Sequence, residues 1–144
     1  MIPGRIRVIA VCVFRVNDSI LVFEGFDSSK GSPFYRPLGG AVEFGETTQE
    51  ALRRELREEL ELEIANLRLL GTIENIFILE GEKGHEIVYV YDGNFTDKSV
   101  YRQESFTVCE DDGEILTARW RDLDFFDDYH RLVPEELRSL LVSN

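Results

Sequence analysis

The sequence is poor in several features that point to particular classes of protein. Only two of its 144 residues are cysteine, Cys12 and Cys109, and they do not form a C-x-x-C pair. No apolar run approaches the roughly 20 residues that a helix needs to cross a bilayer, and the first residues lack the long apolar segment of a secretory leader. We therefore expect reduced thiols, a cytoplasmic location and no membrane partner.

Basic residues are scarce as well. The chain has 16 Lys and Arg against 28 Asp and Glu, which gives a formal net charge of −12. Such a chain repels phosphate backbones, so we expect no sequence-independent binding of nucleic acid. A nucleotide-sized polyanion is still acceptable if divalent cations neutralise its site. Acidic surfaces keep proteins soluble, but solubility does not explain why so many acids fall in one segment.

The remaining pattern is that of an ordinary globular protein, and its length suits a single domain over residues 1–144. β-branched and aromatic runs predict strands at residues 6–14, 20–23, 34–38, 67–79, 86–95 and 115–120. Residues 27–33 read as a surface loop and residues 80–84 as the link between two strands. Pro134-Glu135-Glu136 is typical of the start of a C-terminal helix. The fold class is mixed α/β (α+β), with one central and one terminal helix on a scaffold of strands.

Residues 47–60 form the clearest predicted helix. Thr47-Thr48-Gln49-Glu50 has the pattern of a capping box, in which the Thr47 hydroxyl accepts from the Glu50 amide and the Glu50 carboxylate reaches back. Leu52, Leu56 and Leu60 follow at a spacing of four residues and predict the buried stripe. This segment is therefore an amphipathic helix with a defined start.

Three glutamates lie beside that buried stripe. At about 100° per residue, Glu55, Glu58 and Glu59 fall within one arc of the helix, where like charges repel, and more strongly as the dielectric falls. One guanidinium, that of Arg54, is too little to balance three acids, whereas Mg²⁺ or Mn²⁺ prefers such oxygen ligands. The alternative is a solvated acidic face paired with neighbouring arginines.

The residues before the helix favour the metal. Gly39-Gly40 allows close approach of the backbone to a ligand, and Glu46 adds a further acid. Five residues separate Gly40 from Glu46, and seven more separate Glu46 from Arg54-Glu55-Leu56-Arg57-Glu58-Glu59. The spacing of these residues resembles the Nudix box of the MutT-like Nudix hydrolases. The box covers residues 40–62 and departs from the family pattern only at Glu61, where the family has glycine.

This resemblance implies a Nudix fold, an α/β/α sandwich with a mixed central sheet, and the activity of a pyrophosphohydrolase. Glu55, Glu58 and Glu59 would bind Mg²⁺ or Mn²⁺, with the carbonyl of Gly40 or of Gly39 completing the shell. By the same resemblance Arg54 positions a box glutamate, Glu46 is its charge partner, and Glu58 or Glu59 is the candidate base, although some members carry the base on a separate loop. The substrate would be a small nucleotide with a diphosphate linkage, such as a nucleoside diphosphate derivative. A homodimer is common in the family.

Glu61 affects the end of the helix. Glycine there would provide a left-handed cap, which glutamate adopts only with strain. We expect a small cost in stability or a slightly longer helix, and not the loss of the site.

The substrate pocket is poorly marked in sequence. Arg36, Glu43 and Gly39 are the candidate substrate contacts, each with a surface role or a backbone role as the alternative. His85 is a candidate proton carrier or a turn residue, and residues 110–114 are a candidate source of a loop-borne base or a solvated turn. Six further residues could face the cleft, the core or a strand edge, and the sequence does not decide between these positions: Phe34, Tyr35, Glu74, Asn75, Phe77 and Tyr89. A nucleotide sensor without turnover is the competing function.

Overall fold

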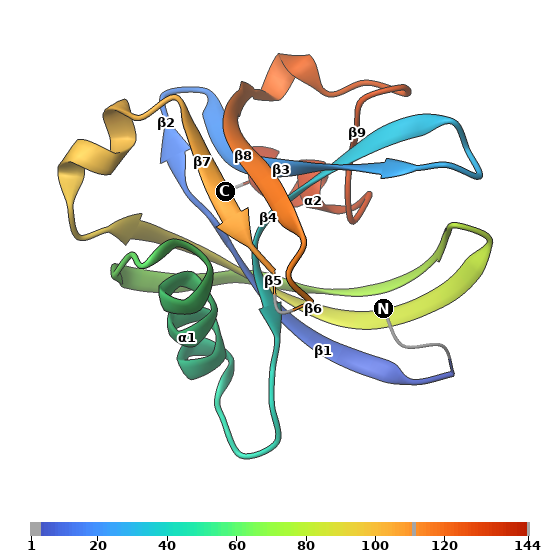
Figure 1. Cartoon of the computed structure of the whole chain (residues 1–144), viewed down its shortest axis with the longest axis horizontal. Helices are drawn as coiled ribbons and strands as arrows, with labels where there is room; N and C mark the ends of the chain where they lie inside the picture. The colour runs from blue at the N-terminus through green and yellow to red at the C-terminus, as the bar shows by residue number, and fades with distance from the viewer. Residues whose placement is uncertain (1–3, 111, 144) are drawn as a thin grey trace.

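The computed structural model describes residues 4–110 and 112–143 (Figure 1). Within these residues the strands are β1 (Ile6–Val13), β2 (Arg15–Val16), β3 (Ser19–Asp27), β4 (Ser32–Ala41), β5 (Ile64–Leu79), β6 (Glu82–Phe95), β7 (Ser105–Cys109), β8 (Ile115–Asp122) and β9 (Arg131–Leu132). They form one sheet in the order β5-β6-β1-β4-β3-β8-β7, with β2 beside β3 and β9 beside β4. The β1–β6 and β4–β9 pairs are parallel and the other pairs antiparallel. The sheet is therefore mixed, as predicted.

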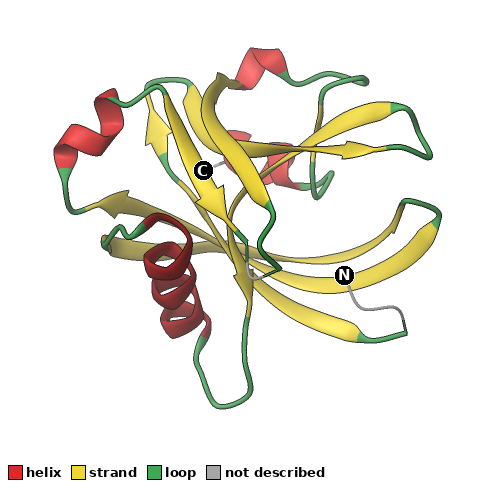
Figure 2. Ribbon diagram, viewed as in Figure 1, coloured by secondary structure: helices red, strands yellow, loops and turns green. Residues whose placement is uncertain are grey.

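The helices cover opposite faces of the sheet (Figures 1 and 2). Leu52 and Leu56 of α1 (Thr48–Leu60) pack on one face, and Leu137 and Leu141 of α2 (Leu137–Val142) pack on the other. Two 3₁₀ turns, η1 (Lys98–Arg102) and η2 (Leu123–Phe125), complete the described helical segments. No helix of the described residues is long and apolar enough to cross a bilayer.

Strand β1 separates the two cores. Its even-numbered residues from Ala10 onward pack on the α1 side, whereas Ile9, Val11 and Val13 pack on the α2 side. This alternation explains why the strand is apolar from Val8 onward, since a strand covered on both faces needs apolar side chains at every covered position. The predicted strand at residues 6–14 is confirmed, and it is buried on both faces from Ile9 onward.

Strand β4 changes partners along its length, and this positions the site. Residues 32–37 pair with β3, whereas residues 38–41 pair with β1. The β3–β4 hairpin and the β5–β6 hairpin both extend to the right of Figure 1, the first above the second. The Gly39-Gly40 pair lies at the point where the two halves of the sheet divide.

Several predicted boundaries were wrong. The loop at residues 27–33 shrinks to the turn between β3 and β4, and Asp27 is only 1% exposed because its carboxylate accepts from the amides of Ser29, Lys30 and Glu80. The link at residues 80–84 shrinks to Glu80-Gly81, where φ is 53° and 80°, the left-handed geometry of a tight hairpin.

The C-terminal helix begins later than predicted. Pro134 precedes α2, which starts at Leu137 after a turn, with Glu136 as its N-cap residue. Strand β7 was not predicted, although its five residues alternate exposed and buried side chains, because so short an alternation lies between polar segments on both sides. The predicted helix at residues 47–60 is confirmed, with Thr47 as N-cap residue and α1 ending at Leu60.

Candidate active site

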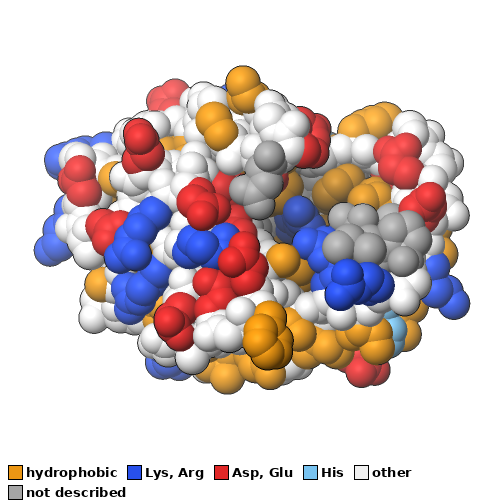
Figure 3. All heavy atoms as spheres, turned by 60° about the horizontal axis from the view of Figure 1, so that its bottom comes forward, with side chains coloured by type: hydrophobic (Ala, Val, Ile, Leu, Met, Phe, Trp, Pro, Cys, Tyr) orange, Lys and Arg blue, Asp and Glu red, His pale blue; other side chains and the backbone are white. Residues whose placement is uncertain are grey.

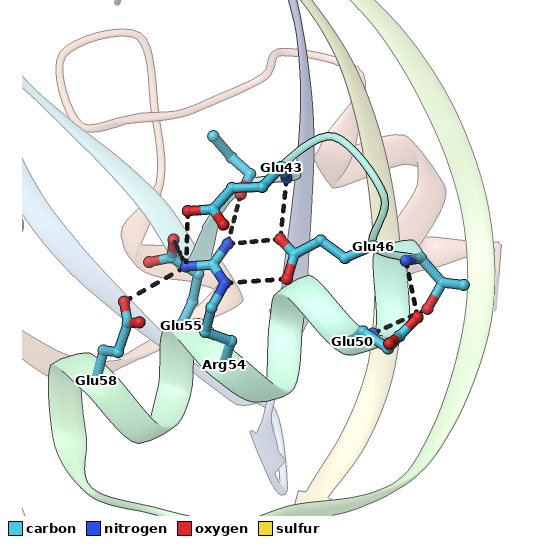
Figure 4. Close-up of polar contacts among 8 residues, drawn as sticks. Glu43, Glu46, Glu50, Arg54, Glu55 and Glu58 are labelled. Carbon is cyan, nitrogen blue, oxygen red and sulfur yellow. Dashed lines mark hydrogen bonds and ion pairs between the residues drawn. The ribbon is translucent and has the colours of Figure 1, made fainter.

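Arg54 lies at the centre of a set of oxygen acceptors on the exposed side of α1 (Figure 4). Its Nε and Nη2 donate to the two carboxylate oxygens of Glu46 at 3.0 and 2.7 Å. Nη2 also donates to the carbonyl of Ala41 at 3.0 Å, and Nη1 donates to Glu55 at 2.9 Å. The guanidinium thus joins the helix to the segment that follows Gly40.

Two further acids lie at the edge of this network. Glu58 reaches Nη1 of Arg54 at 3.4 Å from one helical turn away, and its side chain is half exposed. The Glu43 carboxylate lies 3.8 Å from the same nitrogen and is 69% exposed. Its backbone amide instead donates to Glu46 at 2.9 Å. Glu43 therefore supports the loop more than it faces the helix.

The bidentate contact sets the charge state of this pair. Hydrogen bonds from Arg54, and then from the amide of Glu43, lower the pKa of Glu46 to about 2. The hydrogen bonds to Glu46 also raise the pKa of Arg54 above its ordinary value. Both groups are charged throughout the physiological range, so the support of Glu55 is permanent.

A second group of acids lies underneath. Glu55 and Glu59 are 6% and 7% exposed. Burial, and then the charges of Glu110 and Glu55, raise the pKa of Glu59 well above its usual range, and the hydrogen bonds that Glu59 shares with both neighbours raise it further. Glu110 follows β7 on the loop before β8, so a residue some fifty positions away completes the cluster. Three carboxylates in one low-dielectric place share a proton unless a cation replaces it.

The backbone at Gly40 lies directly against this cluster. A Cβ atom at Gly40 would lie 2.6 Å from a carboxylate oxygen of Glu55, so any larger residue here would displace that carboxylate. The donors are carboxylate and backbone oxygens, which suit a hard divalent cation such as Mg²⁺ or Mn²⁺. Among the described residues, no three acids, cysteines or histidines already surround one point as ligands. Glu58 is held by Arg54, and it would have to leave that contact to join Glu55 and Glu59.

A cleft leads away from the acidic cluster. A small cavity of about 120 Å³ is lined by Gly39, Gly40, Glu55, Glu110 and neighbouring residues of β1, β4 and β6. It shares Arg36, Glu86 and three apolar residues with a larger cavity of about 380 Å³ between the two hairpins. That volume lies within the range of small-molecule sites. In Figure 3 the acidic side chains border a hollow that basic side chains line on its other side.

Arg36 lies where the two cavities meet. Its guanidinium stacks over the ring of Phe23 at 4.8 Å, and its Nε is buried without a hydrogen-bond partner among the described residues. A buried donor without a partner is costly unless a ligand supplies an acceptor. Arg36, Gly39 and Gly40 were predicted from sequence, and the structure brings all three to the acidic cluster.

The other sequence candidates are divided. Phe34, Asn75 and Phe77 line the larger cavity, whereas Tyr35 and Glu74 do not. Tyr35 is buried against Phe125 and Phe126. His85 lies within β6 and not in a turn, on the face opposite to Glu86. In the loop at residues 110–114 only Glu110 reaches the cluster among the described residues, and Asp111 lies outside them.

Two charged residues of the cleft were missed in the sequence. Arg7 and Glu86 are paired across β1 and β6 and both line the small cavity. Each is a charged residue beside a run of apolar ones, and this interruption was the only sign in the sequence that it faces a site. Their common location depends on the parallel pairing of two strands that are far apart in sequence.

Comparison with known proteins agrees with this geometry. The sequence matches the model of the NUDIX domain over residues 4–140. The chain belongs to the NUDIX domain family. Over 100 residues it is 30% identical to an oxidized purine nucleoside triphosphate hydrolase of Danio rerio, a match that covers 69% of this chain and 54% of the relative. The chain thus spans about half the length of the curated relative that it matches.

Solved structures show the same fold. A MutT NUDIX hydrolase from Burkholderia pseudomallei is 22% identical, with a TM-score of 0.60 over 96% of this chain and 98% of the other. A mutator MutT protein from Bacillus halodurans is 14% identical, with a TM-score of 0.63 over 96% of this chain and 83% of the other. At these identities the likeness establishes the fold. The chain therefore has the fold of the NUDIX domain family.

Proposed function

We propose that this Nudix domain hydrolyses a diphosphate linkage in a nucleoside diphosphate derivative or a related nucleotide, with Mg²⁺ or Mn²⁺. One observation carries the proposal: the buried Glu55 and Glu59 and the partly buried Glu110 form an acidic cluster that opens, past Gly40, into a cleft of nucleotide size. An acidic cluster of this kind is costly to keep without a cation, and a polyphosphate is bound through the same cation.

The chain's own residues divide the work as follows. Glu55, Glu58 and Glu59, with a carbonyl of the Gly39-Gly40 pair, would hold the divalent ion. When bound, the ion neutralises the diphosphate and lowers the pKa of a water that it binds. Arg54 keeps Glu55 in place and is itself fixed by Glu46. Glu55 and Glu59 already lie together, and Glu58 joins them by leaving its contact with Arg54.

Proton transfer falls to a carboxylate of the cluster. Glu58 or Glu59 on the helix, or Glu110 on its loop, accepts the proton of the attacking water. Glu59 and Glu110 share hydrogen bonds, so each can pass a proton to the other. Attack of water on phosphorus breaks the bridging phosphorus–oxygen bond and leaves two phosphate products.

Arg36 and Gly39 would contact the substrate. The buried Nε of Arg36 at the meeting point of the two cavities suits a phosphate oxygen. The exposed Glu43 remains a candidate only for the outer edge of the site. Free Cys12 and Cys109 support the expectation of a reducing, cytoplasmic environment.

A substrate panel tests this function. We would incubate the protein and Mg²⁺ or Mn²⁺ with ordinary and oxidised purine nucleoside triphosphates, dinucleoside polyphosphates and nucleotide sugars, in water labelled with ¹⁸O. The panel includes oxidised purines because the name of the zebrafish relative specifies them. We expect metal-dependent nucleotide products, with the label identifying the phosphorus attacked. Tight nucleotide binding with no product across the panel would establish a sensor in place of a hydrolase.

A further inference from the structure

A row of three polar side chains crosses the otherwise apolar floor of the cleft. Arg7 of β1 pairs with Glu86 of β6, and Glu86 pairs with Asn75 of β5. The next row that faces the cleft is apolar, with Ile9, Val88 and Ile73 in register. The three polar residues therefore form a continuous line across three adjacent strands.

This row follows the direction of the cleft. Arg7 lines the small cavity beside the acidic cluster, and Asn75 lines the larger cavity between the hairpins. Glu86 lies between them and lines both cavities. The order along the cleft is therefore a cation, a carboxylate and an amide.

Glu86 is the unusual member of the row. It is 6% exposed, and among residues 4–110 and 112–143 its carboxylate makes no hydrogen bond or ion pair. A carboxylate only accepts hydrogen bonds, so the Glu86 side chain, which lines both cavities, takes its donors from water or from a ligand. A ligand that places two donors in the middle of the cleft would satisfy it.

The geometry points to ribose as that ligand group. We propose that Glu86 is a specificity-determining residue that selects ribonucleotides over deoxyribonucleotides, its carboxylate accepting from the 2′- and 3′-hydroxyls; this rests on the function proposed above. The phosphates lie beside Arg7 and the acidic cluster, and the base lies between the hairpins near Asn75. The sugar is then in the middle, opposite Glu86. Carboxylates bind ribose hydroxyls in the same way in dinucleotide-binding folds.

The base edge fits Glu86 less well. Adenine, cytosine and uracil each present one N–H donor beside an acceptor, and an acceptor would repel the second carboxylate oxygen. Guanine alone presents two adjacent donors, N1–H and N2–H, so the adenine nucleotides give the cleaner comparison. Asn75 both donates and accepts, so it suits a base edge of any kind, and Phe34 and Phe77 offer ring faces in the same cavity. The vicinal diol supplies two donors whatever the base.

Binding of nucleoside monophosphates tests the inference apart from turnover. Calorimetry would compare AMP with dAMP and GMP with dGMP, none of which carries a diphosphate linkage. We expect the wild-type protein to bind each ribonucleotide about 10-fold or more tightly than its deoxy form, since hydrogen bonds to a charged group carry that discrimination. In Glu86→Gln the preference falls to about 3-fold or less, and binding of the deoxy forms changes by less than about 3-fold.

Glu74→Gln is the matched control, because Glu74 neighbours Asn75 but is exposed on the opposite face of β5; it should keep the wild-type preference. Equal binding of ribose and deoxyribose forms by the wild type would overturn the proposal. An equal loss on both forms in Glu86→Gln would also overturn it, by assigning Glu86 to the base. Ribose preference in binding with no hydrolysis across the substrate panel would sink the proposed activity and leave this inference standing.

Discussion

At the scale of single residues, the contacts of Arg54 explain how several acids are held in one place. Its guanidinium reaches Glu46 with two hydrogen bonds and Glu55 with one, and it also holds the carbonyl of Ala41. The planar fork of arginine matches a carboxylate in this bidentate form, which lysine does not. Arg54 therefore positions the buried glutamates without itself being buried among them.

The Glu46→Gln variant tests this support through pH. The folded pKa of Glu46 is about 2 against an ordinary value of 4.5, so its charge stabilises the fold above 4.5. That contribution is lost as pH falls through the window between the two values. We expect the variant to unfold more easily than the wild type at pH 7, with the difference narrowing toward pH 3. Denaturant unfolding at several pH values measures it.

The same variant should also need more metal. With Arg54 less firmly held, the Mg²⁺ concentration for half-maximal activity should rise about 10-fold, as for other residues that orient metal ligands. Glu63→Gln removes a surface contact with Arg57 and serves as the control. An unchanged metal requirement in Glu46→Gln would show that Arg54 needs no help from Glu46.

At the scale of elements, α1 is defined at both ends. The capping box at Thr47 and Glu50 fixes its start, and Glu61 ends it in the left-handed region, with φ 57° and ψ 36°. The amide of Glu61 donates to the carbonyl of Arg57 at 2.9 Å. The helix thus stops where the family pattern has glycine, and glutamate takes on the conformation that glycine adopts freely.

The Glu61→Gly variant should be more stable than the wild type. A residue with a Cβ atom is strained in the left-handed conformation, and glycine removes this strain. The gain outweighs the greater freedom of glycine in the unfolded chain, so the free energy of unfolding should rise by about 0.5–1 kcal/mol. Denaturant unfolding measures the gain. Glu61→Ala keeps the Cβ atom and should show no such gain. If both variants gain equally, charge at the end of the helix is the cause and strain is not.

Local signals explain which elements were predictable. The capping residues and the leucine spacing of α1 are contained within 14 consecutive residues, so the helix followed from the sequence. Asp27 was misplaced in a surface loop because its burial depends on the Glu80 amide, 53 positions away. Glu86 was missed because its location in the cleft depends on the register of β6 with β1 and β5. Spacing therefore predicts the acids of the helix, and only strand pairing shows what faces them.

At the scale of the whole molecule, the sheet separates a core that supports the acidic helix from a core that supports the cleft. The core on the α1 side holds the acidic face in position, and the core on the α2 side lies behind the cleft. Strand β1 belongs to both cores, with alternate side chains in each. A cavity in either core should lower the free energy of unfolding, but only a cavity on the α1 side should weaken metal binding.

Two leucines separate these effects. Leu56 of α1 and Leu137 of α2 are 1% and 0% exposed, so replacing either with alanine should cost about 2–5 kcal/mol in the free energy of unfolding. Leu56→Ala should also raise the Mg²⁺ concentration for half-maximal activity, because it loosens the helix that carries Glu55. Leu137→Ala should leave that concentration unchanged. An equal rise in this Mg²⁺ concentration in both variants would mean that both cores support the metal site.

The most direct test of the central claim is hydrolysis of the best nucleotide substrate, with Mg²⁺, by Glu58→Gln and Glu59→Gln. Each change removes a charge without changing size, and Glu61→Gln makes the same change at the end of the same helix. We expect kcat to fall by about 100-fold or more in the first two variants, as when a metal-bound or proton-accepting carboxylate is lost. Glu61→Gln should keep wild-type turnover, and all three should remain folded. Wild-type turnover in folded Glu58→Gln and Glu59→Gln would contradict the account.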